Sequence, residues 1–389
     1  MPSEALDLLR SFVTKGHASA AAAAVVTLSD AALFAVGRRR SLRLDTETST
    51  LRPSPAAAVD LDTAFDLASL TKPMSTLGLL ARGIGDGSLD LDEPLASALP
   101  LAAGSAMAEV PLRSLVGHGS GWPAWRDFAT VFDDDRAAGR ARRDAHALRH
   151  DIVAAVLATP PERPAGVAVV YSDLGYLTLG FLLEARLRRP LDVATFELFS
   201  ALPVAAPPTY RRTPVGLSPR DNDVVATEIW PRRCRAGWPL QGVVHDDNAA
   251  ALEGVAGHAG LFASIRGVAA WAREWLRAIC GREVALGGAL LPEVADLLRR
   301  GQAAPDTSWR LGFDTPSRPS SNAGTLCSDA TFGHLGFVGT SVFFDPMRGA
   351  AVVLLTNRVH PGRDATAAIR ALRPALHDAV WRTMGTGFR

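Results

Sequence analysis

Short apolar runs that suit β-strands lie near both ends of the chain, and apolar residues at helical spacing fill the middle. Residues 21–30 (AAAAVVTLSD) and 31–40 (AALFAVGRRR) are two apolar runs around a Ser-Asp pair, which predicts two antiparallel strands and a turn. Residues 332–346 (FGHLGFVGTSVFFDP) and 349–358 (GAAVVLLTNR) predict two adjacent strands joined by the turn DPMRG. The opening residues 1–16 have the amphipathic pattern of a helix.

Helices are predicted between these strand regions and after them. Apolar residues recur at helical spacing, with Pro and Gly as breakers, in residues 76–89, 142–160, 175–190, 266–279 and 364–384. The pattern predicts an α/β (α+β) fold, in which an antiparallel sheet built from both termini carries an inserted all-α lobe. Residues 1–75 and 255–389 would form the sheet lobe and residues 76–254 the mainly helical lobe. We expect a single catalytic unit with the site between the lobes.

Composition and charge favour small-molecule partners. The 389 residues are 48% hydrophobic, enough to bury a large core. With 41 basic and 40 acidic residues, the formal charge is +1, so no binding to nucleic acid or to an anionic membrane is expected. The start of the chain lacks a basic segment followed by an apolar one, which favours a soluble, cytoplasmic protein. The oligomeric state is left open.

The cysteines and histidines do not predict a metal site. Cys234, Cys280 and Cys327 lack the paired spacing of zinc or redox motifs, so free thiols are expected. His258 and the neighbours His245 and Asp246 show no third and fourth ligand at a recognisable spacing, which favours structural or cleft-edge roles. We therefore expect neither a metal nor a cofactor.

The segment FDLASLTKPM, residues 65–74, places Lys72 three positions after Ser69. The chain has two lysines, Lys15 and Lys72, among 41 basic residues. Arginine holds its proton in proteins, whereas a desolvated lysine amine can release one, so this position favours proton chemistry. Pro73 requires the following helix to begin close to Ser69, which puts the hydroxyl at a helix N-terminus with Lys72 on the same face. A capping serine beside an ordinary lysine is the alternative.

Two later segments offer partners for this pair. Tyr171, in VVYSDLGY, is one of three tyrosines, and a phenol near an ammonium can act as a general base and later as a general acid. His334 and Gly336 lie in the predicted strand FGHLGFVGTS, where a glycine lets the strand backbone approach a ligand closely.

Together these motifs resemble the serine β-lactamase-like superfamily: class C β-lactamases, penicillin-binding D-alanyl peptidases and related esterases. The superfamily pattern is Ser-x-x-Lys, then Tyr-x-Asn, then Lys/His/Trp-x-Gly. The matching segments here are Ser69 to Lys72, Tyr171 to Asp173 and His334 to Gly336. The resemblance covers roughly residues 10–380.

The resemblance implies a role for each matching residue. Ser69 would be the nucleophile of an acyl-enzyme, and Lys72 with Tyr171 would handle its proton. The backbone amides of Ser69 and Phe337 would form the oxyanion hole. His334 would tune Tyr171 and touch the substrate, together with Gly336. Three further residues are candidates for contact with the substrate: Asp173, Trp122 and Arg358.

Departures from the superfamily pattern shape the expected substrate. Asp173 stands where Asn is usual, and we expect it to pair with Lys72 and keep it charged, which makes Tyr171 the base. Leu335 and Phe337 supply no hydroxyl for a substrate carboxylate. Arg358 would be an alternative ligand for one, but a surface or ion-paired arginine is the favoured role for Arg358. For Trp122, packing against the helical lobe is an equal alternative to lining the cleft.

These residues leave three functions open. The leading prediction is a metal-free serine hydrolase, an esterase or amidase acting on small apolar acyl groups. A β-lactamase, a D-alanyl peptidase or a muramyl-peptide amidase is the second prediction. The third is a relative that binds an acyl ligand without turnover. An α/β-hydrolase centred on Ser120 near His118 is disfavoured, because GHGSGW is not the Gly-x-Ser-x-Gly motif.

Overall fold

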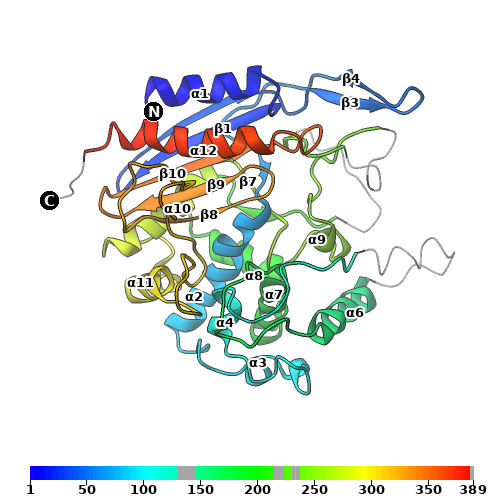
Figure 1. Cartoon of the computed structure of the whole chain (residues 1–389), viewed down its shortest axis with the longest axis vertical. Coiled ribbons are helices and arrows are strands. Elements are labelled where there is room, and N and C mark those ends of the chain that lie inside the picture. Colours follow the sequence, from blue (N-terminus) through cyan, green and yellow to red (C-terminus); the bar gives the residue numbers. More distant parts are fainter. Residues whose placement is uncertain (130–144, 214–222, 230–232, 234–236, 386–389) are drawn as a thin grey trace.

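The computed structural model describes residues 1–129, 145–213, 223–229, 233 and 237–385, and it contains one five-stranded antiparallel sheet (Figure 1). The strand order in this sheet is β2-β1-β10-β9-β8. Its strands are β1 Ala20–Thr27, β2 Ala31–Gly37, β8 Phe332–Leu335, β9 Ser341–Asp345 and β10 Ala350–Thr356. The two ends of the chain meet where β1 pairs with β10, in a register that sets Ala21 opposite Thr356. The predicted antiparallel sheet built from both termini is confirmed.

A two-stranded sheet, a three-stranded sheet and the helices are the other regular elements of the described residues. The remaining strands are β3 Leu42–Asp45, β4 Thr50–Pro53, β5 Phe65–Asp66, β6 Thr209–Tyr210 and β7 Leu261–Ala263. The helices are α1 Ser3–Thr14, α2 Leu77–Gly85, α3 Leu95–Ala98, α4 Leu112–Val116, α6 Ala145–Ala158, α7 Asp173–Leu187, α8 Leu191–Phe199, α9 Asp247–Ala251, α10 Ile265–Ile279, α11 Pro292–Arg300 and α12 Thr366–Trp381.

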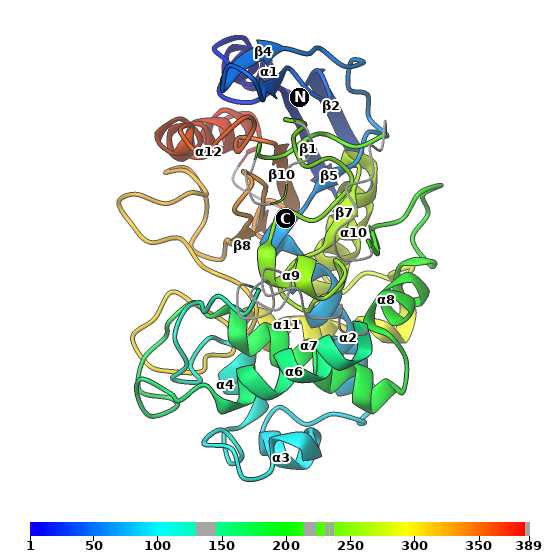
Figure 2. The same cartoon turned by 90° about the vertical axis from the view of Figure 1, so that its right-hand side faces the viewer.

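The five-stranded sheet is covered on both faces because its central strands are apolar on both sides. Successive side chains of a strand point to opposite faces. In β1, Ala20, Ala22 and Ala24 pack into the core shared with α10, whereas Ala21 and Ala23 pack into the core shared with α1 and α12. Figure 2 shows α12 and α10 on opposite sides of the sheet.

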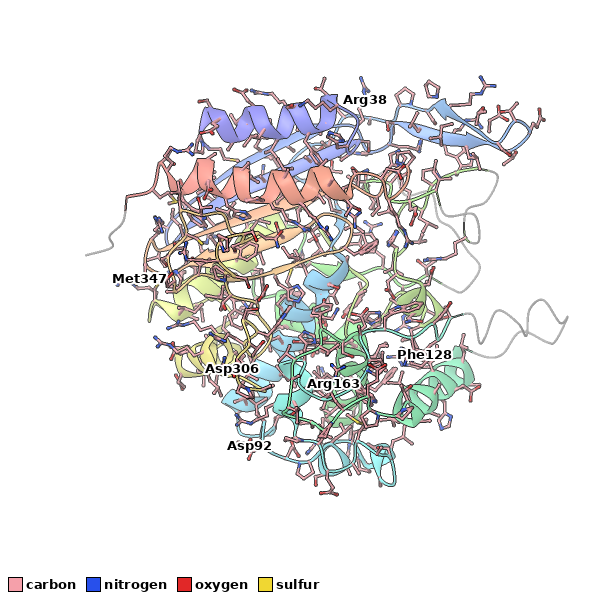
Figure 3. The ribbon with its side chains drawn as sticks, in the orientation of Figure 1. Arg38, Asp92, Phe128, Arg163, Asp306 and Met347 are labelled. Carbon is pink, nitrogen blue, oxygen red and sulfur yellow. The ribbon has the colours of Figure 1, made fainter. Side chains whose placement is uncertain are left out.

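Helices from the middle of the chain lie below the sheet layer in Figure 1, where α2, α4, α6, α7 and α8 gather. Figure 3 shows Arg38 at the sheet end of the molecule and Asp92 at the opposite, helical end. β6 comes from this middle part of the sequence but pairs with β7, in the three-stranded sheet β5-β7-β6. The lobe boundaries near residues 75 and 255 stay a prediction. Within the described residues, no helix has both the length and the apolar character needed to cross a membrane.

The sequence interpretation is wrong about the run of residues 332–346, which holds two strands. A turn at Gly336–Thr340 separates β8 from β9, because Gly339 has a φ of +111° and the Gly336 amide donates to the Thr340 carbonyl over 2.8 Å. A glycine adopts this φ without the strain that a side chain would cause. The turn lies beside the catalytic serine candidate.

The cysteines do not form a cluster in the described residues. Cys280 and Cys327 are free thiols, as expected. Cys234 lies outside the described residues.

Candidate active site

Ser69 lies on a tight backbone turn between β5 and α2. The residue before it, Ala68, has a φ of +48°, in the left-handed region that residues with a side chain rarely adopt. A 3₁₀ turn covers Ala68–Leu70, and a π-helical segment, Lys72–Thr76, leads into α2. In a regular α-helix the ring of Pro73 would clash with the carbonyl of Ser69, four residues earlier, and the wider π turn relieves that crowding. The prediction that the helix begins close to Ser69 is confirmed.

The amine of Lys72 is completely buried and surrounded by oxygen atoms. Its Nζ donates to Ser69 Oγ over 2.9 Å, to Asp173 Oδ1 over 2.6 Å and to the His258 carbonyl over 3.3 Å. Its three N–H groups therefore have three acceptors, as an ammonium requires. The expected pairing of Asp173 with Lys72 is confirmed.

Tyr171 is the third candidate catalytic residue, and its ring lies beside the Lys72 amine. Its ring centre lies 4.8 Å from Lys72 Nζ, and Lys72 and Ser69 are both close enough to its hydroxyl to lower its pKa against the effect of burial. The rings of His118, Trp309 and His334 surround it at 4.5, 5.2 and 5.9 Å between ring centres. The rings hold the phenol in place, and Trp309 is a neighbour that no sequence motif singled out.

Electrostatics keep both candidate bases protonated in the resting site. Burial lowers the pKa of Lys72, but the Asp173 carboxylate and Tyr171 outweigh burial and raise that pKa above its ordinary value. Burial raises the pKa of Tyr171 above its ordinary value, although the charge of Lys72 opposes this. The coupled pair must therefore lose one proton before it can take the proton of Ser69.

The backbone amides of Ser69 and Phe337 both lack an acceptor among the residues that the structure describes. Phe337 is the second residue after the end of β8, next to Gly336, and its side chain is 48% exposed. Two free amides on segments that meet at one site suit the stabilisation of an oxyanion. Their role stays a prediction.

His334 and His118 are buried neutral rings with opposite tautomers. His334 Nδ1 lies 2.8 Å from the Leu335 carbonyl, which can only accept, so Nδ1 carries the proton and Nε2 is a bare acceptor. His118 Nδ1 accepts from the Ser172 amide over 3.1 Å, so its Nε2 carries the proton. Burial lowers the pKa of His334 to about 3 and the pKa of His118 well below its usual value, and the charge of Lys72 adds to both effects. Neither imidazole changes charge near neutral pH.

Three further predicted site residues have packing contacts that bear on their roles. A Cβ on Gly336 would lie 1.9 Å from Thr340 Oγ1, so this glycine allows a close backbone approach. Trp122 is 1% exposed and donates its indole N–H to the Thr159 carbonyl, which favours the packing alternative. Arg358 is buried, and three groups accept hydrogen bonds from it: the Phe337 carbonyl, the Thr366 hydroxyl and the Arg363 carbonyl.

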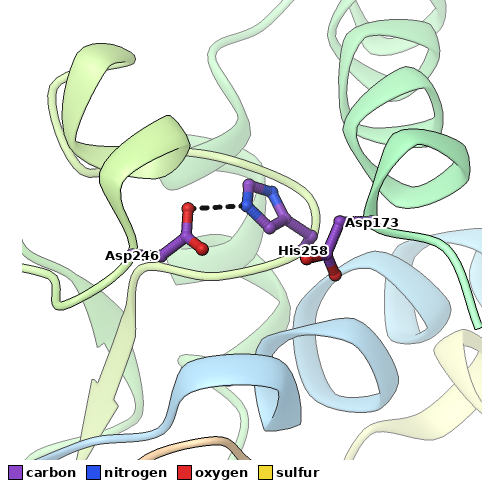
Figure 4. A group of neighbouring side chains, drawn as sticks. All are labelled: Asp173, Asp246 and His258. Atoms are coloured by element: carbon purple, nitrogen blue, oxygen red, sulfur yellow. Dashed lines mark hydrogen bonds and ion pairs between the residues drawn. The ribbon is translucent and has the colours of Figure 1, made fainter. Parts of the chain in front are cut away.

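Asp246 and His258 form a second polar group (Figure 4), and the His258 carbonyl accepts from Lys72. Asp246 Oδ1 lies 2.8 Å from His258 Nε2, and Asp173 supplies a third side chain, with potential ligand atoms of all three within 4.8 Å of one another. Asp173 lies far from the other two residues in the sequence, so sequence spacing does not reveal this group, and the expected absence of a metal stays a prediction. By spacing the three could hold a metal ion, but Asp173 already binds the Lys72 ammonium. Burial raises the pKa of Asp246, but His258, the Ala249 amide and the charge of Lys72 together lower it below its usual range.

The effect of Asp173 on Lys72 predicts a pH dependence. Because the pKa of Lys72 and that of Tyr171 are raised, kcat/KM for an ester should increase with pH into the alkaline range. Asp173→Asn removes the charge that holds the proton on Lys72, while burial remains and lowers the pKa. The rising limb should therefore move to lower pH, by about one pH unit or more. Initial rates measured across the neutral and alkaline pH range would report the shift.

Asp192 offers a matched control for Asp173. Both lie in the first turn of a helix, both are ion-paired, and their side chains are 18% and 22% exposed, but Asp192 pairs with Arg212. Asp192→Asn should leave the pH profile unchanged. A rising limb that stays in place in Asp173→Asn would show that the charge of Asp173 does not control the proton of Lys72.

Comparison with known proteins places the chain in a family. The model of the family "Beta-lactamase" matches residues 7–377. An N-acetylmuramyl-L-alanine amidase of Bacillus subtilis (strain 168) is 30% identical over 319 residues, 77% of this chain and 68% of that protein. Two solved structures share the fold. EstCE1, a hydrolase with promiscuous acyltransferase activity, has a TM-score of 0.67 at 20% identity, covering 97% of each chain. A beta-lactamase/D-alanine carboxypeptidase from Pseudomonas syringae has a TM-score of 0.65 at 14% identity, covering 98% of each chain.

The family match covers every segment from which the site is built. Ser69, Lys72, Tyr171 and Phe337 all lie within the matched residues 7–377. The predicted resemblance to the serine β-lactamase-like superfamily is confirmed, and with it the fold. The chain belongs to the Beta-lactamase family and is a serine hydrolase.

Proposed function

We propose that this protein hydrolyses esters or small amides of apolar acyl groups through an acyl-enzyme on Ser69. The observation that carries the proposal is the hydrogen bond from buried Lys72 to the Ser69 hydroxyl, beside two backbone amides without an acceptor in the described part of the chain. A nucleophile, a proton acceptor and oxyanion donors at one place are what acyl transfer requires.

The first chemical step would form the acyl-enzyme. Once the Lys72–Tyr171 pair has lost a proton, the Tyr171 oxygen takes the proton of Ser69 as Oγ attacks the acyl carbon. The carbonyl oxygen gains the negative charge, and the amides of Ser69 and Phe337 donate to it. Collapse of this tetrahedral species breaks the bond to the leaving group, which leaves with the proton from Tyr171.

The second step would release the acyl group. A water molecule gives a proton to the same pair and attacks the ester carbon of acylated Ser69. The bond to Oγ breaks, Oγ takes back a proton, and the free acid leaves. Each cycle consumes one water and returns Ser69, Lys72 and Tyr171 to their starting protonation states.

Side chains near the oxyanion candidates favour an uncharged acyl group. Leu335 and Phe337 carry no hydroxyl that would bind a substrate carboxylate. The guanidinium of Arg358 is held by groups of the protein itself. We therefore rank apolar esters and amides above β-lactams and D-alanyl peptides, both of which carry a carboxylate.

A muramyl-peptide amide is the second candidate substrate. The relative at 30% identity is named as an N-acetylmuramyl-L-alanine amidase, and amide cleavage uses the same acyl-enzyme steps. This substrate also carries a carboxylate, on its L-alanine, so we rank it below apolar esters and amides.

A substrate panel tests the proposal. Wild-type protein would be incubated with p-nitrophenyl butyrate, N-acetylmuramyl-L-alanine, a D-alanyl-D-alanine peptide and a chromogenic cephalosporin, and both product and protein mass would be measured. We expect the highest kcat/KM on the ester and an acyl adduct on Ser69. Higher activity on the muramyl amide would support the second candidate. Ligand-induced stabilisation without any product would contradict hydrolysis and support a binding role.

A further inference from the structure

Asp66 is a buried carboxylate that joins the Ser69 turn to a distant segment. It is 2% exposed, its Oδ1 accepts from the Ala68 amide over 2.8 Å, and its Oδ2 accepts from the His245 amide over 2.7 Å. Ala68 is the residue with a φ of +48° immediately before Ser69. A strained backbone persists only where its surroundings hold it, and the Asp66 bond holds the Leu67–Ala68 peptide, which adjoins the peptide that carries the Ser69 amide.

The same segment continues to the second oxyanion candidate. The imidazole of His245 stacks on the Phe337 ring, with 5.6 Å between ring centres and 24° between planes. His245 Nε2 lies 2.8 Å from Glu228 Oε2, which fixes the rotation of the imidazole. Arg358 lies 4.7 Å from the centre of the Phe337 ring and donates to the Phe337 carbonyl over 2.9 Å. Both the ring and the peptide of Phe337 are therefore held.

A second contact joins the turn after β8 to the backbone that precedes Ser69. Thr340 Oγ1 donates to the Leu67 carbonyl over 3.0 Å. A Cβ on Gly336 would approach that same carbonyl to 2.7 Å. The turn after β8 thus rests directly on the backbone that precedes Ser69.

We propose that Asp66 and His245 are positioning residues that set the distance and angle between the amides of Ser69 and Phe337. This inference rests on the proposed function, in which those amides stabilise the oxyanion. The two amides come from segments far apart in the sequence, and oxyanion donors act only when aimed at one point. Asp66 positions the amide of Ser69, and the ring of His245 positions the amide of Phe337.

The first test replaces Asp66 by asparagine. The new carboxamide keeps one acceptor and turns an N–H towards one of the two backbone donors. We expect Asp66→Asn to reduce the single-turnover rate of acylation by p-nitrophenyl butyrate about 10- to 100-fold. The affinity for butylboronic acid, which forms a tetrahedral adduct on serine, should fall in proportion, while KM changes by less than about threefold.

Asp60→Asn is the matched control. Asp60 also accepts bonds from its own turn, from the Asp62 amide and the Thr63 hydroxyl, but it lies outside the site. The acylation rate of the Asp60→Asn variant should stay within about twofold of wild type.

A second pair of variants tests the two contacts of the His245 ring separately. These variants also test the proposal if Asp66→Asn does not fold. Both variants keep the backbone amide that binds Asp66. His245→Phe keeps an aromatic ring against Phe337 and loses the bond to Glu228. His245→Gln keeps a donor for Glu228 and loses the stacking. We expect acylation within about threefold of wild type for His245→Phe and a loss of about tenfold for His245→Gln.

The outcomes separate this inference from the function on which it rests. Folded Asp66→Asn with acylation within about twofold of wild type, or equal acylation rates for the two His245 variants, would overturn the positioning role while the proposed function stands. Wild-type protein that neither acylates on Ser69 nor binds the boronic acid would overturn both.

Discussion

Ser69→Ala should reduce kcat for p-nitrophenyl butyrate by about 10⁴-fold or more, to the background rate. The variant removes the oxygen that accepts from Lys72 Nζ at 2.9 Å and that would form the acyl bond. The hydroxyl is also one of the three acceptors of the buried Lys72 ammonium, so the variant should stay folded but lose about 1–3 kcal/mol of stability, which thermal unfolding would measure. Mass spectrometry after exposure to a fluorophosphonate should show one adduct on wild type and none on the variant.

Ser120→Ala is the control for this experiment. Ser120 is a buried serine near His118, and a normal rate in its variant would also exclude it as a nucleophile. Turnover by Ser69→Ala close to the wild-type rate would refute the acyl-enzyme on Ser69.

Lys72→Arg should reduce kcat about 10³-fold, although the positive charge is kept. A guanidinium keeps its proton at any pH that the protein survives, so residue 72 can no longer exchange a proton with Tyr171 or Ser69, and Tyr171 must act as the base alone. The larger side chain must also fit where Lys72 is fully buried, which should destabilise the fold by about 1–3 kcal/mol. Stopped-flow acylation and thermal unfolding would measure the two effects separately.

The chain contains its own control for this substitution. Lys15, the other lysine, is exposed at the end of α1, and Lys15→Arg should change neither rate nor stability. Acylation at a near-wild-type rate by Lys72→Arg would show that Lys72 acts through its charge alone.

Local patterns predicted the strand regions of the five-stranded sheet and several of the helices, whereas β3 to β7 and the helices α3, α4, α8, α9 and α11 were not predicted. The Ser-Asp pair between two apolar runs predicted β1 and β2, and helical spacing predicted α2, α6, α7, α10 and α12. The division of residues 332–346 into two strands was missed because apolar residues continue on both sides of the turn. Only the positive φ of Gly339 marks that turn, and a glycine inside an apolar run is compatible with several local structures.

The site residues that could be predicted from the sequence are those that lie in short motifs. Ser69 and Lys72 are three residues apart, and the unusual lysine drew attention to them. The identity of Asp173 predicted its ion pair with Lys72, because a carboxylate near a buried amine has one favourable arrangement.

The missed part of the site depends on contacts between distant segments. Asp66 precedes Ser69 by three residues, yet its partner His245 lies far along the sequence and binds through its backbone. Trp309 reaches Tyr171 from the loop after α11. Backbone donors and ring contacts leave no spacing in the sequence that would reveal them.

The pairing of β1 with β10 has a consequence for how the protein is made. During synthesis on a ribosome, Ser69 and Lys72 emerge well before the segment of Phe337 and β10. Strand partners so distant in sequence give a high contact order, and chains of this kind fold slowly. The nascent chain therefore contains its proposed nucleophile before the second proposed oxyanion donor is made, and under the proposed mechanism acyl transfer can begin only after β8, β9 and β10 have joined the sheet.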